Sequence, residues 1–158
     1  MSSTEFPSLD QSLKSLRAAG IVTAPGGLGL IRVAGDDAAT FLHSQLTNAV
    51  EDLTASTARL AGYCSPKGRL MASFLMWRDA DGIVLQLSAD IQPPIQKRLT
   101  MFVLRAKAKL SDLSATHGIL GIAGAGAEAA LQQAGLPTPQ APLATASDDN
   151  VTVIRLAD

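Results

Sequence analysis

The stretch "AGYCSPKGRLMASFLMW" (61–77) joins two apolar segments through a short polar turn. Proline suits the second position of a type I turn and glycine the fourth, and Pro66 and Gly68 occupy these positions. The flanking segments alternate and are rich in strand-forming residues. We therefore predict an antiparallel hairpin with strands over 58–65 and 69–78.

Two cations, Lys67 and Arg69, lie at the mouth of this hairpin. A lysine in a turn is usually just solvated. Arg69 is less ordinary, because alternation places it on one strand face with an apolar row. That row comprises Met71, Ser73, Leu75 and Trp77. A planar guanidinium there suits a carboxylate ligand, and a buried aspartate would explain it equally well.

The segments around the hairpin predict an α+β fold of antiparallel sheets with packed helices. The strand "IVLQLS" (83–88) extends the hairpin to a three-stranded meander, and "LGLIRVAG" (28–35) alternates as a further strand. A helix over 38–48 follows Gly35-Asp36-Asp37, and we expect an aspartate to cap it. A second helix opens at Pro93-Pro94. We expect its buried stripe to comprise Ile95, Leu99 and Phe102.

The segment "LRAKAKLSDL" (104–113) alternates strictly and predicts a strand. A period of two places Arg105, Lys107 and Lys109 on one face and the apolar residues on the other. The three cations could bind a polyanion such as a carboxylate tail, phosphates or RNA. A solvated sheet face explains them as well.

The composition divides the chain into three parts. Residues 1–26 hold a short helix over 8–19 and a linker, and residues 27–114 form the antiparallel-sheet domain. Residues 115–158 begin a second, truncated α/β subdomain, with a strand over 116–124, an alanine-rich helix, a proline-rich loop over 136–150 and a last strand. Because that strand ends the sequence, we expect the chain to be the front of a longer protein.

The bulk composition excludes several classes of site. A net charge of −1 provides no global attraction for nucleic acid, so we expect no direct DNA binding. The one cysteine, Cys64, rules out an internal disulfide and reads as a core residue. His43 and His117 lack ligand spacing, so we expect no metal site. We see no secretory signal and no membrane span, and a cytoplasmic location fits.

The stretch "GAGAEA" (124–129) matches G-x-G-x-x-A between a predicted strand and a helix. This is the context of a dinucleotide-binding fingerprint, with Gly124 and Gly126 beside the pyrophosphate. Asp158 would then take the ribose role, although it lies further along than the usual ~20 residues. A nucleotide-binding module is therefore one alternative.

Three stretches together resemble one family: "GLIRVAGDDAATFLHSQLTN" (29–48), "YCSPKGRLMASFLMW" (63–77) and "KRLTMFVLRAKAKLSD" (97–112). In this order they are similar to the N-terminal half of YgfZ-type folate-binding proteins, relatives of the glycine-cleavage T protein, an aminomethyltransferase. The resemblance runs from about Gly27 to Asp112. The family's Lys-Gly-Cys-Tyr-x-Gly-Gln-Glu motif would lie beyond residue 158, so its reactive cysteine is not Cys64. Relatives often have Asp where this chain has Ala49.

The resemblance implies a GcvT/YgfZ-like fold, incomplete at its C-terminus, around a cavity for tetrahydrofolate. It also implies support of iron–sulfur client enzymes, including those that modify tRNA, and leaves an aminomethyltransferase as the alternative. We expect Lys67, Arg69, Arg105 and Lys107 to face the anionic part of the folate. Tyr63 is a candidate to stack on the pterin ring, whereas Trp77 is better suited to the core.

Overall fold

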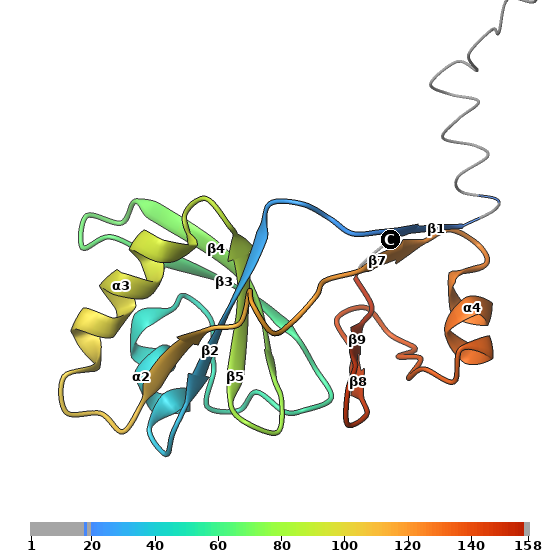
Figure 1. The fold of residues 1–158 in the computed structure, drawn as a ribbon. Coiled ribbons are helices and arrows are strands. Elements are labelled where there is room, and N and C mark those ends of the chain that lie inside the picture. Colours follow the sequence, from blue (N-terminus) through green and yellow to red (C-terminus); the bar gives the residue numbers. More distant parts are fainter. Residues whose placement is uncertain (1–17, 19, 157–158) are drawn as a thin grey trace, which may run out of the picture.

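A computed structural model describes residues 18 and 20–156 (Figure 1). The predicted helix over 8–19 falls, apart from Ala18, outside the described residues. The strands are β1 (Ile21–Thr23), β2 (Leu28–Ala34), β3 (Arg59–Cys64), β4 (Leu70–Arg78), β5 (Ile83–Ser88), β6 (Lys109–Asp112), β7 (Gly121–Ala123), β8 (Thr145–Ser147) and β9 (Thr152–Ile154). The helices are α2 (Ala38–Gln45), α3 (Gln92–Val103) and α4 (Ala127–Gln133).

A five-stranded antiparallel sheet in the order β3-β4-β5-β2-β6 forms the larger part of the molecule. Both α2 and α3 pack against one face of it, and Figure 1 shows them together on one side. The main core lies between them, with Ile31, Leu42, Phe74, Met76, Leu85 and Leu99 almost fully buried. The predicted α+β class and the β3-β4-β5 meander are confirmed.

The opposite face of the sheet carries a second, smaller core. Trp77, Val84 and Leu30 lie there with Leu113, and Ile119 and Ile154 from the C-terminal segment pack on them. Two small antiparallel pairs, β1 with β7 and β8 with β9, lie on this side of the sheet, and α4 lies beyond them (Figure 1). The expected core position of Trp77 is therefore confirmed.

The structure shortens the predicted strand over 104–113. Only β6 is a strand, because α3 continues to Val103 and the chain reverses at Leu104 before it reaches β2. The predicted alternation survives in the burial pattern from Arg105 to Leu110, whereas Leu104, expected on the apolar face, is 86% exposed. Arg105, Lys107 and Lys109 are exposed, while the intervening Ala106 and Ala108 pack against the main core. The pattern therefore marks a buried and an exposed side even where no strand forms.

Two expectations about the helices are wrong. No aspartate side chain caps α2, because the Asp37 carboxylate accepts a hydrogen bond from the backbone N–H of Lys107 instead (2.7 Å). Phe102 is 45% exposed rather than buried, because it lies at the end of α3 beyond the sheet. Gln92 takes its place in the buried stripe beside Ile95 and Leu99.

The C-terminal segment contains one strand that was not predicted, and its predicted strands are shorter than expected. The proline-rich loop over 136–150 contains β8, and the predicted strands shrink to three-residue segments because each has only one short partner. β1 was not expected. Its pairing with β7 is antiparallel, and so is that of β8 with β9. The described part of the chain thus lacks the parallel β-α-β unit that a dinucleotide fingerprint needs, and the nucleotide-binding interpretation of "GAGAEA" is not supported.

Candidate functional site

The β3–β4 turn has the predicted type I geometry. The N–H of Gly68 donates to the carbonyl of Ser65 (2.9 Å), and the N–H of Ser65 donates to the carbonyl of Arg69 (2.8 Å). Gly68 has a φ of 74°, which a residue with a Cβ rarely adopts. Lys67 and Arg69 are both exposed on this turn. Neither forms an ion pair among the described residues, so both are available to an anion.

A β-bulge changes the side chains next to the turn. The β3–β4 register shifts between Tyr63 and Cys64, so Cys64 pairs with Leu70 and Met71 packs against the main core. The predicted row from Arg69 through Met71 to Ser73 is therefore interrupted. Leu70 instead lies over Gly62, with its Cδ1 2.9 Å from where a Cβ of Gly62 would be.

The outer face of the hairpin is consequently apolar and open. Leu60 and Leu70 are 63% and 65% exposed, and Gly62 and Ser73 lie between them as a register pair. Exposed leucines on neighbouring strands form a surface that favours an apolar ligand group. We call Leu60, Gly62, Leu70 and Ser73, together with the turn cations, the hairpin face.

The segment after α2 closes the edge of β3 beside the hairpin face. The Thr47 hydroxyl accepts a hydrogen bond from the N–H of Gly62 (2.8 Å), and the Thr47 N–H donates to the Gly62 carbonyl (2.9 Å). The Asn48 side-chain amide donates to the Leu60 carbonyl (2.8 Å). The segments "LTN" (46–48) and "RLAGYC" (59–64), which are distant in the sequence, thus meet at one edge, and their hydrogen bonds satisfy backbone groups of the otherwise open edge of β3.

Arg59 fastens the loop that follows. Its guanidinium donates to the Ala49 carbonyl (3.0 Å) and forms a two-pronged pair with the Asp52 carboxylate (2.6 and 3.2 Å). The hydrogen bond from Arg59 holds the pKa of Asp52 below its ordinary value. Ala49 therefore contributes its backbone carbonyl here.

Replacing Thr47 with valine should lower the free energy of unfolding by about 1 kcal/mol, because the Gly62 N–H loses its acceptor. Amide hydrogen exchange at Gly62 should accelerate with it. Thr47→Ser retains the hydroxyl and is the matched control, with little change in either measurement. Unchanged exchange at Gly62 in Thr47→Val would contradict the proposed edge contact.

Lys107 and Arg105 lie far from the hairpin face. Lys107 is fastened to the turn before α2, where its carbonyl accepts from the Asp37 N–H (3.1 Å) and its ammonium lies 3.6 Å from Asp36. Lys107 thus has an intramolecular carboxylate nearby, although both side chains are largely exposed to solvent. Arg105 is exposed and forms no ion pair among the described residues.

The sheet topology separates the two pairs of cations. Three successive antiparallel pairings lie between β4 and β6, so these strands run in opposite directions. β4 begins from the turn that carries Lys67 and Arg69, and β6 begins from the segment that carries Arg105 and Lys107. The two pairs therefore lie at opposite ends of the sheet (Figure 1), and one concave site cannot unite them.

Tyr63 does not reach the hairpin face. It lies on the core side of β3 and is 4% exposed within the main core, because alternation turns it away from Gly62 and Cys64. Its ring therefore packs in the interior. Cys64 is half-buried and its thiol is free.

Sequence reasoning missed a groove of about 480 Å³ between α3 and β6. Gln92 and Asp112 lie at one end of it and Lys97 and Met101 along it. Hydrogen bonds from Ser114 hold the pKa of the Asp112 carboxyl below its ordinary value. In the sequence, only the helical spacing of Gln92 from Ile95 and Leu99 could have indicated that its side chain faces inward here. A glutamine by itself does not indicate a binding site.

Other kinds of site find little support in residues 18 and 20–156. That part of the chain holds no cluster of three or more metal-ligating side chains. Its helices are all too short or too polar to cross a bilayer.

Comparison with known protein families identifies the family of this chain. Residues 2–155 match the model of the GCVT N-terminal domain. The chain belongs to the GCVT N-terminal domain family. The resemblance to YgfZ-type proteins and to the glycine-cleavage T protein is confirmed.

Similar proteins of this family include the tRNA-modifying protein YgfZ of Edwardsiella ictaluri, 35% identical over 116 residues, or 72% of this chain and 34% of the relative. YgfZ of Vibrio vulnificus is 29% identical over 104 residues, or 66% of this chain and 32% of the relative. The aminomethyltransferase T of Bartonella henselae superposes with a TM-score of 0.76 at 20% identity, over 85% of this chain and 37% of that one. The latter shows a shared fold. The chain spans about a third of the length of these curated relatives.

Proposed function

We propose that this GCVT-family chain binds tetrahydrofolate at the hairpin face. The observation that carries the proposal is the juxtaposition of exposed Leu60 and Leu70 with the unpaired cations Lys67 and Arg69. Tetrahydrofolate combines an apolar pterin–benzoyl body with an anionic glutamate tail. The leucines would contact the body, and the cations at the turn would bind the carboxylates.

The edge contacts support this assignment because they make the surface rigid. Thr47 and Asn48 hold β3 at Gly62 and Leu60, and the Ser65 bonds fix the turn. A site that is already ordered loses less entropy when it binds a ligand. Arg105 and Lys107 stay predicted anion-facing residues, but not toward the same folate molecule.

We place this binding in the cellular role that the YgfZ relatives carry in their name, modification of tRNA. The chain would act through bound tetrahydrofolate, by supporting iron–sulfur enzymes of that pathway in the cytoplasm. The chain spans about a third of the length of these relatives, and further parts of such a protein would complete the cavity.

Calorimetric titration of tetrahydrofolate into the 158-residue chain tests the proposal. Replacing both Lys67 and Arg69 with alanine should weaken binding about tenfold, equal to ~1.4 kcal/mol. The affinity should fall with added salt, because exposed charges are screened. Arg105→Ala, at the opposite end of the sheet, is the matched control and should bind as the parent chain does. Equal weakening by Arg105→Ala would refute this site, and so would the absence of binding both by this chain and by a full-length protein that contains it.

A further inference from the structure

Exposed apolar side chains concentrate where α3 ends. Met101, Phe102 and Leu104 are 58%, 45% and 86% exposed, although they lie within four residues of one another. Single exposed apolar residues are normal on a protein surface, but a group of this kind usually marks a contact site. Figure 1 shows the end of α3 at the outer side of the large sheet, away from β1 and β7.

The backbone at Leu104 is strained. Its φ of 46° and ψ of −103° lie outside the regions that residues with a Cβ favour. Glycine would adopt this conformation freely, yet the chain has a leucine, whose side chain projects almost wholly into solvent. Strain that serves no packing purpose is a signal of function. The geometry presents Leu104 as an anchor for another molecule.

Cations precede and follow these apolar side chains in the chain. Lys97, Arg98 and Arg105 form no ion pair among the described residues. The Arg98 guanidinium lies 5.7 Å from the centre of the Phe102 ring, and its Nε is buried without a hydrogen-bond partner. The guanidinium is thus held in place on the ring. We call this surface the α3 tip: Lys97, Arg98, Met101, Phe102, Leu104 and Arg105.

The α3 tip continues into the groove between α3 and β6. Lys97 and Met101, one helical turn apart, line both. The groove thereby extends the surface along α3 and provides Gln96 and Thr100 as polar contacts, while the Asp112 carboxylate at its far end restricts acidic side chains of an occupant to the end near Lys97. The groove and the α3 tip thus form one continuous surface.

We propose that the α3 tip is a docking site for an acidic, amphipathic segment of a partner protein. Glutamate or aspartate side chains would pair with Lys97, Arg98 and Arg105, and apolar side chains would cover Met101 and Leu104. An amphipathic segment that lays its apolar face into a groove is a common mode of recognition. Charge complementarity selects the acidic kind, because the cations of the α3 tip lack intramolecular partners.

RNA and membrane fit the same surface less well. Unpaired bases bind by stacking on aromatic rings, and here the only ring is Phe102, already covered on one face by Arg98. A helix that lies in a membrane interface needs an apolar stripe along its length. The stripe of α3, with Ile95 and Leu99, is buried in the core instead.

The test measures binding of a labelled 15-residue peptide with a helical glutamate and leucine pattern to the 158-residue chain. Fluorescence anisotropy should detect binding that weakens with salt. Leu104→Gly should weaken it about tenfold, as expected for an interface anchor, and should also raise the stability of the chain because the strain is relieved. This pair of effects separates loss of binding from loss of folding. Leu120→Ala, at another exposed leucine (68% exposed), is the control and should change neither.

Several results would overturn the proposal. A scrambled peptide of equal charge that binds equally well would reduce the α3 tip to a non-specific charged surface. Binding of tRNA or of anionic phospholipid vesicles, but not of the acidic peptide, would assign the surface to those partners. Unweakened peptide binding by Leu104→Gly, or no peptide binding at all, would also refute it.

Discussion

Replacing Gly35 with alanine is expected to lower the free energy of unfolding by about 4 kcal/mol. The Cβ of an alanine would lie 2.1 Å from the Lys107 carbonyl oxygen and 2.9 Å from its carbon. Gly35 also has a φ of 119°, which strains any residue with a side chain. Because the obstacle is backbone, no rotamer change can relieve it. The collision would open the contact that joins the turn before α2 to the segment before β6.

Urea denaturation monitored by circular dichroism measures this loss. Gly118→Ala is the matched control, because nothing lies within 4 Å of a Cβ at Gly118 and its φ is not in the positive range. Its stability should stay within about 0.5 kcal/mol of the parent chain. A loss below about 1 kcal/mol for Gly35→Ala would mean that Lys107 does not lie against Gly35 in solution.

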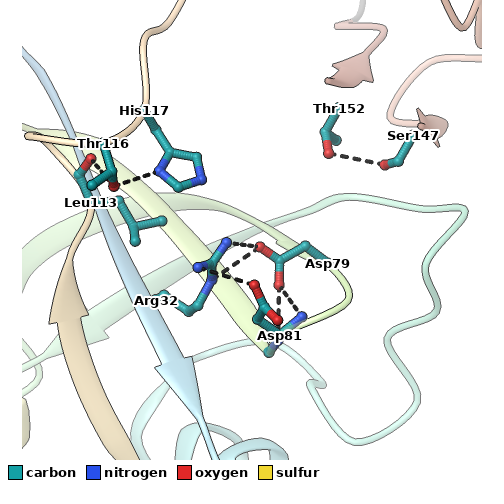
Figure 2. A network of polar contacts seen from close by, with 9 residues as sticks. Arg32, Asp79, Asp81, Leu113, Thr116, His117, Ser147 and Thr152 are labelled. Carbon is teal, nitrogen blue, oxygen red and sulfur yellow. Dashed lines mark hydrogen bonds and ion pairs between the residues drawn. The ribbon is translucent and has the colours of Figure 1, made fainter. Parts of the chain in front are cut away.

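Replacing Arg32 with alanine is expected to lower the free energy of unfolding by about 2–3 kcal/mol. Arg32 on β2 donates from both Nε and a terminal nitrogen to the Asp79 carboxylate, and it lies 3.4 Å from Asp81 (Figure 2). The side chains of Arg32 and Asp79 are only 18% and 17% exposed. Without the guanidinium, the Asp79 charge would remain largely desolvated and unpaired. The estimate lies below the full value for a buried pair because both groups retain some contact with water.

A double-mutant cycle isolates this pair from the turn that Asp79 also shapes. One Asp79 carboxylate oxygen accepts from the N–H groups of Asp81 and Gly82 (3.0 and 2.8 Å), and Asp79→Asn retains an oxygen for this role. Arg32→Ala and Asp79→Asn combined should cost less than the sum of the two single changes. Additive losses would show that the pair contributes no coupling. Arg69→Ala, on the exposed turn, should alter stability by less than about 0.5 kcal/mol.

Local chemistry was enough to predict four strands of the large sheet and the position, but not the length, of β6. The turn at Ser65–Arg69 follows from Pro66 and Gly68, whose preferences act over four residues. The alternation around Phe74 and Met76 identified a face that must be buried, and the structure buries it. The exposed side of Arg105 and Lys107 was predicted for the same reason. These features depend on alternation with a period of two, which separates a buried from an exposed face whichever element packs against the strand.

The composition of the candidate site depended on distant contacts. The β-bulge beside Tyr63 brought Leu70 over Gly62 and interrupted the row predicted for Arg69, and no local signal distinguishes a bulge from a regular pair. The strand order then placed Lys67 and Lys107 at opposite ends of one sheet. The sequence alone therefore determined which face of most strands is buried, since that follows from periodicity, but not the burial of Tyr63 or the exposure of Phe102 and Leu104. Only the tertiary structure decided which exposed residues share a surface, because register and strand order result from packing across the whole chain.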